Sequence, residues 1–149
     1  MSLRFVLIST TIATLLSIPS GGASSAEHVV KMMNDNGKGE YMVFEPNFVQ
    51  AEPGDTVKFV AVDQFHNAET LPEIWPEGAA PFQGELSKDV VLTIDKEGIY
   101  GIKCLPHFAM GMMAFVVAGK PVNASQVTSF KPPSPAQKRY DALVAKLPK

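Results

Sequence analysis

The sequence contains a single cysteine, Cys104, among its 149 residues. One thiol excludes an internal disulfide framework, and it excludes zinc and iron–sulfur sites that need several cysteines. The same count excludes haem attachment through a Cys-x-x-Cys-His motif. In an oxidising compartment a free thiol needs burial or a bound partner, so Cys104 is expected to have a specific role.

The sequence also lacks an excess of positive charge. It has 13 Lys and Arg residues against 15 Asp and Glu residues, for a formal net charge of −2. This balance argues against a nucleic-acid-binding protein, whose affinity depends on a strong basic excess. Hydrophobic residues make up 46% and charged residues 19%, which favours a buried core over intrinsic disorder.

Long hydrophobic runs are limited to the N-terminus. A short basic start precedes the apolar run 5–18, and the small residues 23–26 offer a cleavage site. The run is short for a membrane span, although a retained anchor is the alternative. We therefore expect residues 1–26 to be a secretory signal peptide and residues 27–149 to form one exported domain that includes a helical tail, 124–149.

Short strand-like segments fill the first part of this domain. The 12 Pro and 11 Gly of the sequence favour many turns. Segments rich in β-branched and aromatic residues lie at 28–33, 41–45, 48–50, 56–62, 90–94, 99–103 and 113–118. Residues 63–86 show no sustained period and are expected to form a long loop. Seven or eight short strands predict an all-β, Greek-key sandwich.

The C-terminal tail has a helical pattern. We expect Ser134 to cap a helix that begins at Pro135, with Gln137 reaching back to the cap. A shorter helix is expected over 124–129, after the cap residue Asn123. One apolar stripe is formed by Tyr140, Leu143, Val144 and Leu147, which predicts packing of the tail against the sandwich.

A cluster of metal-ligand residue types lies between the last two predicted strands. Cys104, His107 and Met112 follow the spacing Cys-x2-His-x4-Met, and a second imidazole, His66, follows the strand 56–62. Two His, one Cys and a weak Met form the ligand set of blue-copper electron-transfer sites. Soft sulfur suits Cu(I) and imidazole suits Cu(II), so a mixed set serves both oxidation states.

Each of these residues has a simpler explanation when taken alone. Cys104 could be a buried structural thiol, the two histidines could be ordinary loop residues, and Met112 could fill the core. A Cys–His nucleophile is a further alternative, but no third orienting group or oxyanion pocket is evident in the sequence.

The sequence resembles the pseudoazurin group of the cupredoxin, or type 1 blue-copper, family. The resemblance rests on residues 100–107 with 110–112, on 52–57 and 76–79, and on the helical tail. It implies a cupredoxin-type sandwich of seven to eight strands with one or two C-terminal helices. It also implies one copper ion, Cu(II)/Cu(I), with the metal ligands His66, Cys104, His107 and Met112. Met112 would be the axial ligand, and Met110 and Met113 are the competing thioethers.

The resemblance also implies a function. Pseudoazurins are soluble periplasmic carriers that shuttle one electron between redox partners and are not enzymes. The implied acceptor is a copper nitrite reductase in denitrification, with a c-type cytochrome as a possible donor, and the carrier is expected to be monomeric. The alternative is a copper-storage or copper-delivery protein that binds Cu(I) through Cys104, Met110, Met112 and Met113.

Further roles follow from the same resemblance. Asn67 is expected to tie the His66 loop to the Cys104 loop, and Pro106, which has no N–H, to keep water from the site. Met42 is expected either to pack against the exposed ligand ring, that of His107, or to fill the core. Pseudoazurins usually surround the copper edge with lysines, but here Gln64 and Phe65 replace a Lys-Gly pair and 80–83 has no lysine. Lys31, Lys38 and Lys103 remain as candidates for a weaker docking patch.

Overall fold

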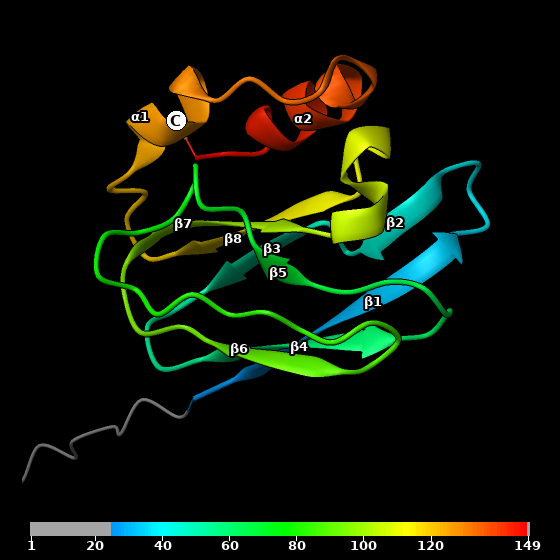
Figure 1. Cartoon of the computed structure of the whole chain (residues 1–149). Coiled ribbons are helices and arrows are strands. Elements are labelled where there is room, and N and C mark those ends of the chain that lie inside the picture. Colours follow the sequence, from blue (N-terminus) through cyan, green and yellow to red (C-terminus); the bar gives the residue numbers. More distant parts are fainter. Residues whose placement is uncertain (1–24, 149) are drawn as a thin grey trace, which may run out of the picture.

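Two β-sheets face each other, and helices cover one of them on the outside (Figure 1). The computed structural model describes residues 25–148. Its strands are β1 (Glu27–Asp35), β2 (Tyr41–Glu45), β3 (Phe48–Ala51), β4 (Thr56–Ala61), β5 (Glu69–Thr70), β6 (Val90–Thr93), β7 (Gly98–Lys103) and β8 (Met113–Ala118). Its helices are the 3-10 turns η1 (Leu105–Met110) and η2 (Ser134–Ala136) and the α-helices α1 (Ala124–Ser129) and α2 (Gln137–Val144).

The strand order places distant segments side by side. One sheet has the order β2-β1-β4-β6 and the other β3-β8-β7-β5. The pairs β1–β4 and β3–β8 are parallel, whereas the hairpin-like pair β7–β8 is antiparallel. The expected all-β sandwich with C-terminal helices is confirmed. The loop between β4 and β5 and the loop between β7 and β8 carry the predicted ligands.

Strand β8 is buried on both faces, which explains its continuous apolar sequence. Ala114 and Val116 face the core between the sheets, with Phe59 and Tyr100. Phe115 and Val117 belong to a second cluster, which packs under the helical tail. The helices therefore complete the fold by covering a sheet face that would otherwise expose apolar side chains to water.

The tail packs as predicted, but its helices start differently. Tyr140 and Leu143 are buried, and the Tyr140 ring meets Phe115 edge-on at 5.9 Å. Ser134 makes no capping bond, because residues 134–136 form a 3-10 turn, and Gln137 donates to Asp141 instead. The Asn123 side chain also makes no capping bond; it binds both backbone groups of Ile99 in β7. The Asn123 side chain therefore makes a polar contact with β7 in place of a cap on α1.

The structure also bears on the expected loop 63–86 and on the N-terminal segment. The expected loop 63–86 contains a short strand, β5, which pairs with β7 through Glu69 and Lys103. The expected signal peptide, 1–26, lies outside the described residues except for Ser25 and Ala26, and its boundary stays a prediction. Ala26 is held in the fold, because its amide donates to Asp55. Within residues 25–148, no helix has the length and apolar character needed to cross a bilayer.

Candidate metal centre

Three donor atoms from two loops meet at one end of the sandwich. The Nδ1 atoms of His66 and His107 lie 3.1 Å apart, and Cys104 Sγ lies 3.7 Å from the first and 3.5 Å from the second. Cys104 and His66 are fully buried, whereas His107 is half-buried. The structure thus brings together residues that are 38 and 41 positions apart in the chain.

Backbone hydrogen bonds close the loop that carries Cys104 and His107. The amide of Cys104 donates to the carbonyl of Met112 (3.0 Å), and the amide of Met112 donates to the carbonyl of His107 (3.2 Å). Gly111 makes the sharp return possible, since its φ of 88° is rarely adopted by other residues. These bonds place Met112 beside Cys104, as the predicted spacing requires.

The three neighbouring methionines have different surroundings. Met112 is fully buried in the same core cluster as Cys104. Met113 points to the other face of β8, into the cluster under the helical tail. Met110 is exposed at the end of η1. The burial pattern therefore favours Met112 over the two competing thioethers.

The tautomer of His66 is fixed by a residue that the sequence analysis missed. His66 Nε2 lies 3.0 Å from Oδ1 of Asn34, which can only accept a hydrogen bond, so Nε2 carries the proton. Burial, followed by the charge of His107, lowers the pKa of His66 from its usual value, which keeps the ring neutral. The Nδ1 lone pair is then free to bind a cation. Asn34 lies near the end of β1, and no motif in the sequence indicates its contact with His66.

The thiol of Cys104 needs a cation to act as a thiolate. Burial raises the pKa of Cys104, although the backbone amides of Asn67 and His107 act in the opposite direction. A bound metal ion reverses this preference, because a coordinating thiol is deprotonated.

The donor separations fit such an ion. A point equidistant from the three atoms at the printed separations lies about 2.0 Å from each, close to metal–nitrogen and metal–sulfur bond lengths in proteins. Soft sulfur with two imidazoles suits copper or zinc on ligand chemistry alone.

Comparison with known proteins decides between these metals. Residues 30–119 match the family model described as copper binding proteins, plastocyanin/azurin family. The chain belongs to this copper-binding family. A pseudoazurin from Paracoccus pantotrophus is 43% identical over 136 residues, which cover 91% of this chain and 92% of that protein. A pseudoazurin from Methylorubrum extorquens is 38% identical and covers 99% of both chains.

Solved structures agree with this family assignment. Native pseudoazurin from Hyphomicrobium denitrificans has a TM-score of 0.79 and 50% identity, covering 83% of this chain and 99% of that one. Pseudoazurin from Methylobacterium extorquens has a TM-score of 0.76 and 43% identity, covering 80% and 98%. The chain is therefore a blue-copper electron-transfer protein of the cupredoxin type, and the predicted resemblance to pseudoazurins is confirmed.

Bound copper would supply the one-electron couple, and the residues of this chain orient the ligands and limit their contact with water. Asn34 orients His66, and core burial of Cys104 and Met112 excludes water. The Asn67 Oδ1 accepts the amide of Leu105 at 2.8 Å, so the expected tie between the two loops is present. A site held in this way needs little rearrangement when its charge changes by one.

Proposed function

We propose that this protein is a periplasmic, monomeric electron carrier that passes one electron to a copper nitrite reductase, with a c-type cytochrome as a possible donor. It makes and breaks no substrate bonds, so it is not an enzyme. The observation that carries the proposal is the close triangle of His66, Cys104 and His107 at the loop end of a cupredoxin sandwich. The pseudoazurin relatives support the functional class.

The proposed metal ligands are His66, Cys104, His107 and Met112. The first three supply the donor atoms described above, and Met112 is the thioether that shares the core cluster with Cys104. The proposed topology is a signal peptide, 1–26, followed by one cupredoxin domain, 27–149, including the tail.

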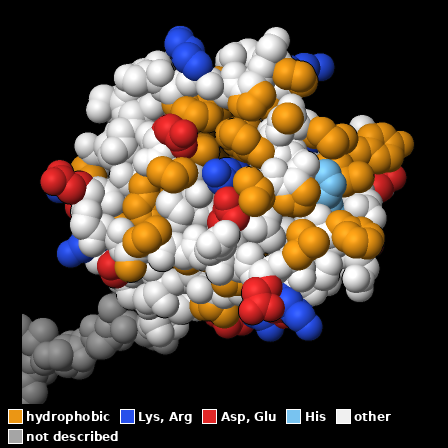
Figure 2. Space-filling view, in the orientation of Figure 1, with side chains coloured by type: hydrophobic (Ala, Val, Ile, Leu, Met, Phe, Trp, Pro, Cys, Tyr) orange, Lys and Arg blue, Asp and Glu red, His pale blue; other side chains and the backbone are white. Residues whose placement is uncertain are grey.

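An apolar surface next to His107 supports contact with a redox partner. Phe65, Leu105 and Met110 are exposed to 68%, 56% and 51% and come from the two ligand-bearing loops. Figure 2 shows hydrophobic side chains gathered around a histidine at the surface. We call Phe65, Leu105 and Met110 the apolar rim. A brief contact over this rim would bring a partner close to the half-buried ligand.

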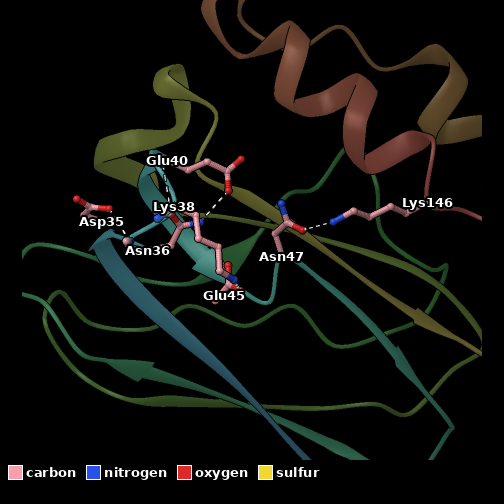
Figure 3. Close-up of polar contacts among 8 residues, drawn as sticks. Asp35, Asn36, Lys38, Glu40, Glu45, Asn47 and Lys146 are labelled. Carbon is pink, nitrogen blue, oxygen red and sulfur yellow. Dashed lines mark hydrogen bonds and ion pairs between the residues drawn. The ribbon is translucent and has the colours of Figure 1, made fainter.

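Carboxylates pair with two of the three lysines that could strengthen docking. Lys103 lies 3.5 Å from Glu69, and only 19% of its side chain is exposed. Lys38 is in the turn between β1 and β2, and its Nζ lies 3.1 Å from Oε1 of Glu45, the last residue of β2 (Figure 3). The exposed Lys38–Glu45 pair contributes little to stability, but both pairs reduce the positive field seen by a partner. Apolar contact is therefore proposed to contribute more to docking than charge.

Reconstitution with copper tests this function. The purified mature protein should bind one copper and give an intense blue or green thiolate-to-Cu(II) absorption. The reduced protein should then transfer its electron to a copper nitrite reductase in stopped-flow mixing. A colourless complex that holds only Cu(I) would instead indicate copper storage or delivery, and the electron-carrier proposal would be wrong.

A further inference from the structure

The orientation of the Asn67 amide is fixed from both ends. Its Oδ1 accepts the amide proton of Leu105, which follows Cys104 in the chain. Its Nδ2 donates to Oε2 of Glu69 at 2.9 Å and to the carbonyl of Gly84 at 3.3 Å. A side-chain amide can turn over and exchange its donor and acceptor ends, so its neighbours decide which end faces the Cys104 loop.

Glu69 makes the shorter of the two hydrogen bonds that hold the NH2 end of Asn67. It lies in β5 and is 8% exposed, and its carboxylate can only accept hydrogen bonds when ionised. Its Oε2 also accepts a long contact from Gln83 Nε2 (3.5 Å), while Oε1 faces Lys103 Nζ at 3.5 Å. A carboxylate in this place attracts the NH2 end of Asn67 and directs the oxygen toward Leu105.

We propose that Glu69 is a positioning residue of the copper centre: it orients Asn67, which in turn holds the backbone next to the Cys104 thiolate. This inference rests on the proposed ligand set. Partners that orient metal ligands indirectly often change metal affinity by about 10–100-fold when removed. The sequence predicts a loop here, and no motif in it indicates a role for Glu69.

Lys103 completes the arrangement by balancing the charge of Glu69. The two residues are directly paired across β5 and β7, and Lys103 immediately precedes Cys104. The Lys103 ammonium also lies 5.7 Å from the centre of the Phe108 ring, in the same loop as His107. A buried carboxylate near copper favours Cu(II), and the ammonium opposes it, so the two charges should have opposite effects on the reduction potential.

Two substitutions separate the hydrogen bond from the charge. Glu69→Gln keeps an oxygen that can accept from Asn67 but removes the charge, whereas Glu69→Leu removes both. Glu73→Gln is the control, because it removes an exposed carboxylate four residues further along the chain, in the segment that follows β5. Copper affinity is measured by competition with a Cu(II) chelator, and exchange of the Leu105 amide proton is measured by NMR in the metal-free protein.

The expected pattern is specific to positioning. Glu69→Leu should weaken copper binding by about 10-fold or more, change the thiolate absorption and speed exchange of the Leu105 amide. Glu69→Gln should retain protection of the Leu105 amide and raise the reduction potential. Lys103→Met should lower the potential, and the double variant with Glu69→Gln should return toward the wild-type value.

Other outcomes would overturn the inference. If both Glu69 variants match Glu73→Gln in copper affinity, absorption, potential and Leu105 exchange while the wild type is blue, Glu69 does not position the site. A wild-type protein without the thiolate absorption would instead contradict the ligand set itself. Loss of folding in Glu69→Leu would leave the decision to Glu69→Gln, whose unchanged potential would also count against the inference.

Discussion

Cys104 combines a fully buried position with two imidazole neighbours, and no other thiol is available to replace it. Cys104→Ser should therefore abolish the visible absorption of the copper protein, because the thiolate is the source of the charge-transfer colour. The fold should remain, since the strands supply the core. Absorption and circular dichroism spectra of the variant with copper check both parts. A coloured serine variant would show that the site is assigned wrongly.

Met112 and Met110 differ in burial although only one residue separates them. Met112→Gln should keep the colour and lower the reduction potential, because a harder axial ligand favours Cu(II). Met110→Gln is the matched control, and its potential should stay at the wild-type value because this side chain lies at the surface. Redox titration of both variants measures the difference. A shift confined to Met110→Gln would transfer the axial role to that residue.

At the scale of elements, Asp55 joins the turn before β4 to the start of β1. Its carboxylate accepts hydrogen bonds from the amides of Ala26 and Glu52 and pairs with His28 at 2.9 Å. Hydrogen bonds from the Ala26 amide, the His28 ring and the Glu52 amide together lower the pKa of Asp55 to about 2. A carboxyl group that ionises more readily when folded stabilises the fold above its ordinary pKa of 3.8.

This stabilisation should be lost as the pH falls from about 4 through about 2. Asp55→Asn should remove that part of the acid dependence and lower the melting temperature at neutral pH. Thermal unfolding between pH 2 and 7 compares the variant with the wild type in chains that retain Ala26, because cleavage after Ala26 would remove the first of the amides that lower the pKa of Asp55. Parallel curves for the two proteins would show that Asp55 does not contribute to acid unfolding.

The tail helix α2 depends on Tyr140. Its ring packs between Phe115 and Phe130, and its hydroxyl donates to the carbonyl of Val127 at 2.6 Å. Burial raises the pKa of Tyr140 to about 12, so the hydroxyl stays protonated. Tyr140→Phe should cost about 1 kcal/mol of unfolding free energy, and Tyr140→Ala about 3–5 kcal/mol.

Urea unfolding measures these losses, and the visible spectrum of the copper-loaded variants provides the second measurement. The spectrum should be unchanged in Tyr140→Phe, because Tyr140 packs in the cluster on the outer face of β8, whereas Cys104 and Met112 lie in the core cluster between the sheets. A variant that keeps full stability without Tyr140 would show that the tail does not contribute to the fold in this way.

At the scale of the whole molecule, the exposed residues beside the site are an apolar rim, and Lys38 and Lys103 are paired with carboxylates. Electron transfer to a partner should therefore depend only weakly on ionic strength, since charges at the rim act mainly on association and are screened within about 10 Å at 0.1 M salt. Phe65→Lys should raise the association rate with an acidic partner at low salt. Val122→Lys is the control, because Val122 is similarly exposed but follows the far end of β8.

Stopped-flow rates over a range of salt concentrations make the comparison. A steep fall in the wild-type rate with added salt would show that Lys31, Lys38 and Lys103 still provide effective attraction. An equal gain from both lysine variants would show that net charge, and not the rim, controls association.

The sequence by itself determined the features that depend on local order. The spacing of Cys104, His107 and Met112 predicted a loop that could bind one ion, and segments rich in β-branched and aromatic residues predicted most strands within a residue or two of their observed bounds. The apolar stripe around Tyr140 predicted where the tail packs. These patterns repeat over a few residues, so nearby positions contain all the information that they need.

Only the tertiary structure decided which polar groups meet across the fold. Asn34 contacts His66 from 32 positions away, and Lys103 forms an ion pair with Glu69. Asn123 binds Ile99 and does not cap a helix. Each contact joins segments that lie far apart in sequence, and the residue type alone does not show which partner it will find. A buried polar group must find such a partner because leaving it unpaired is costly, but the sheet pairing decides which partner lies within reach.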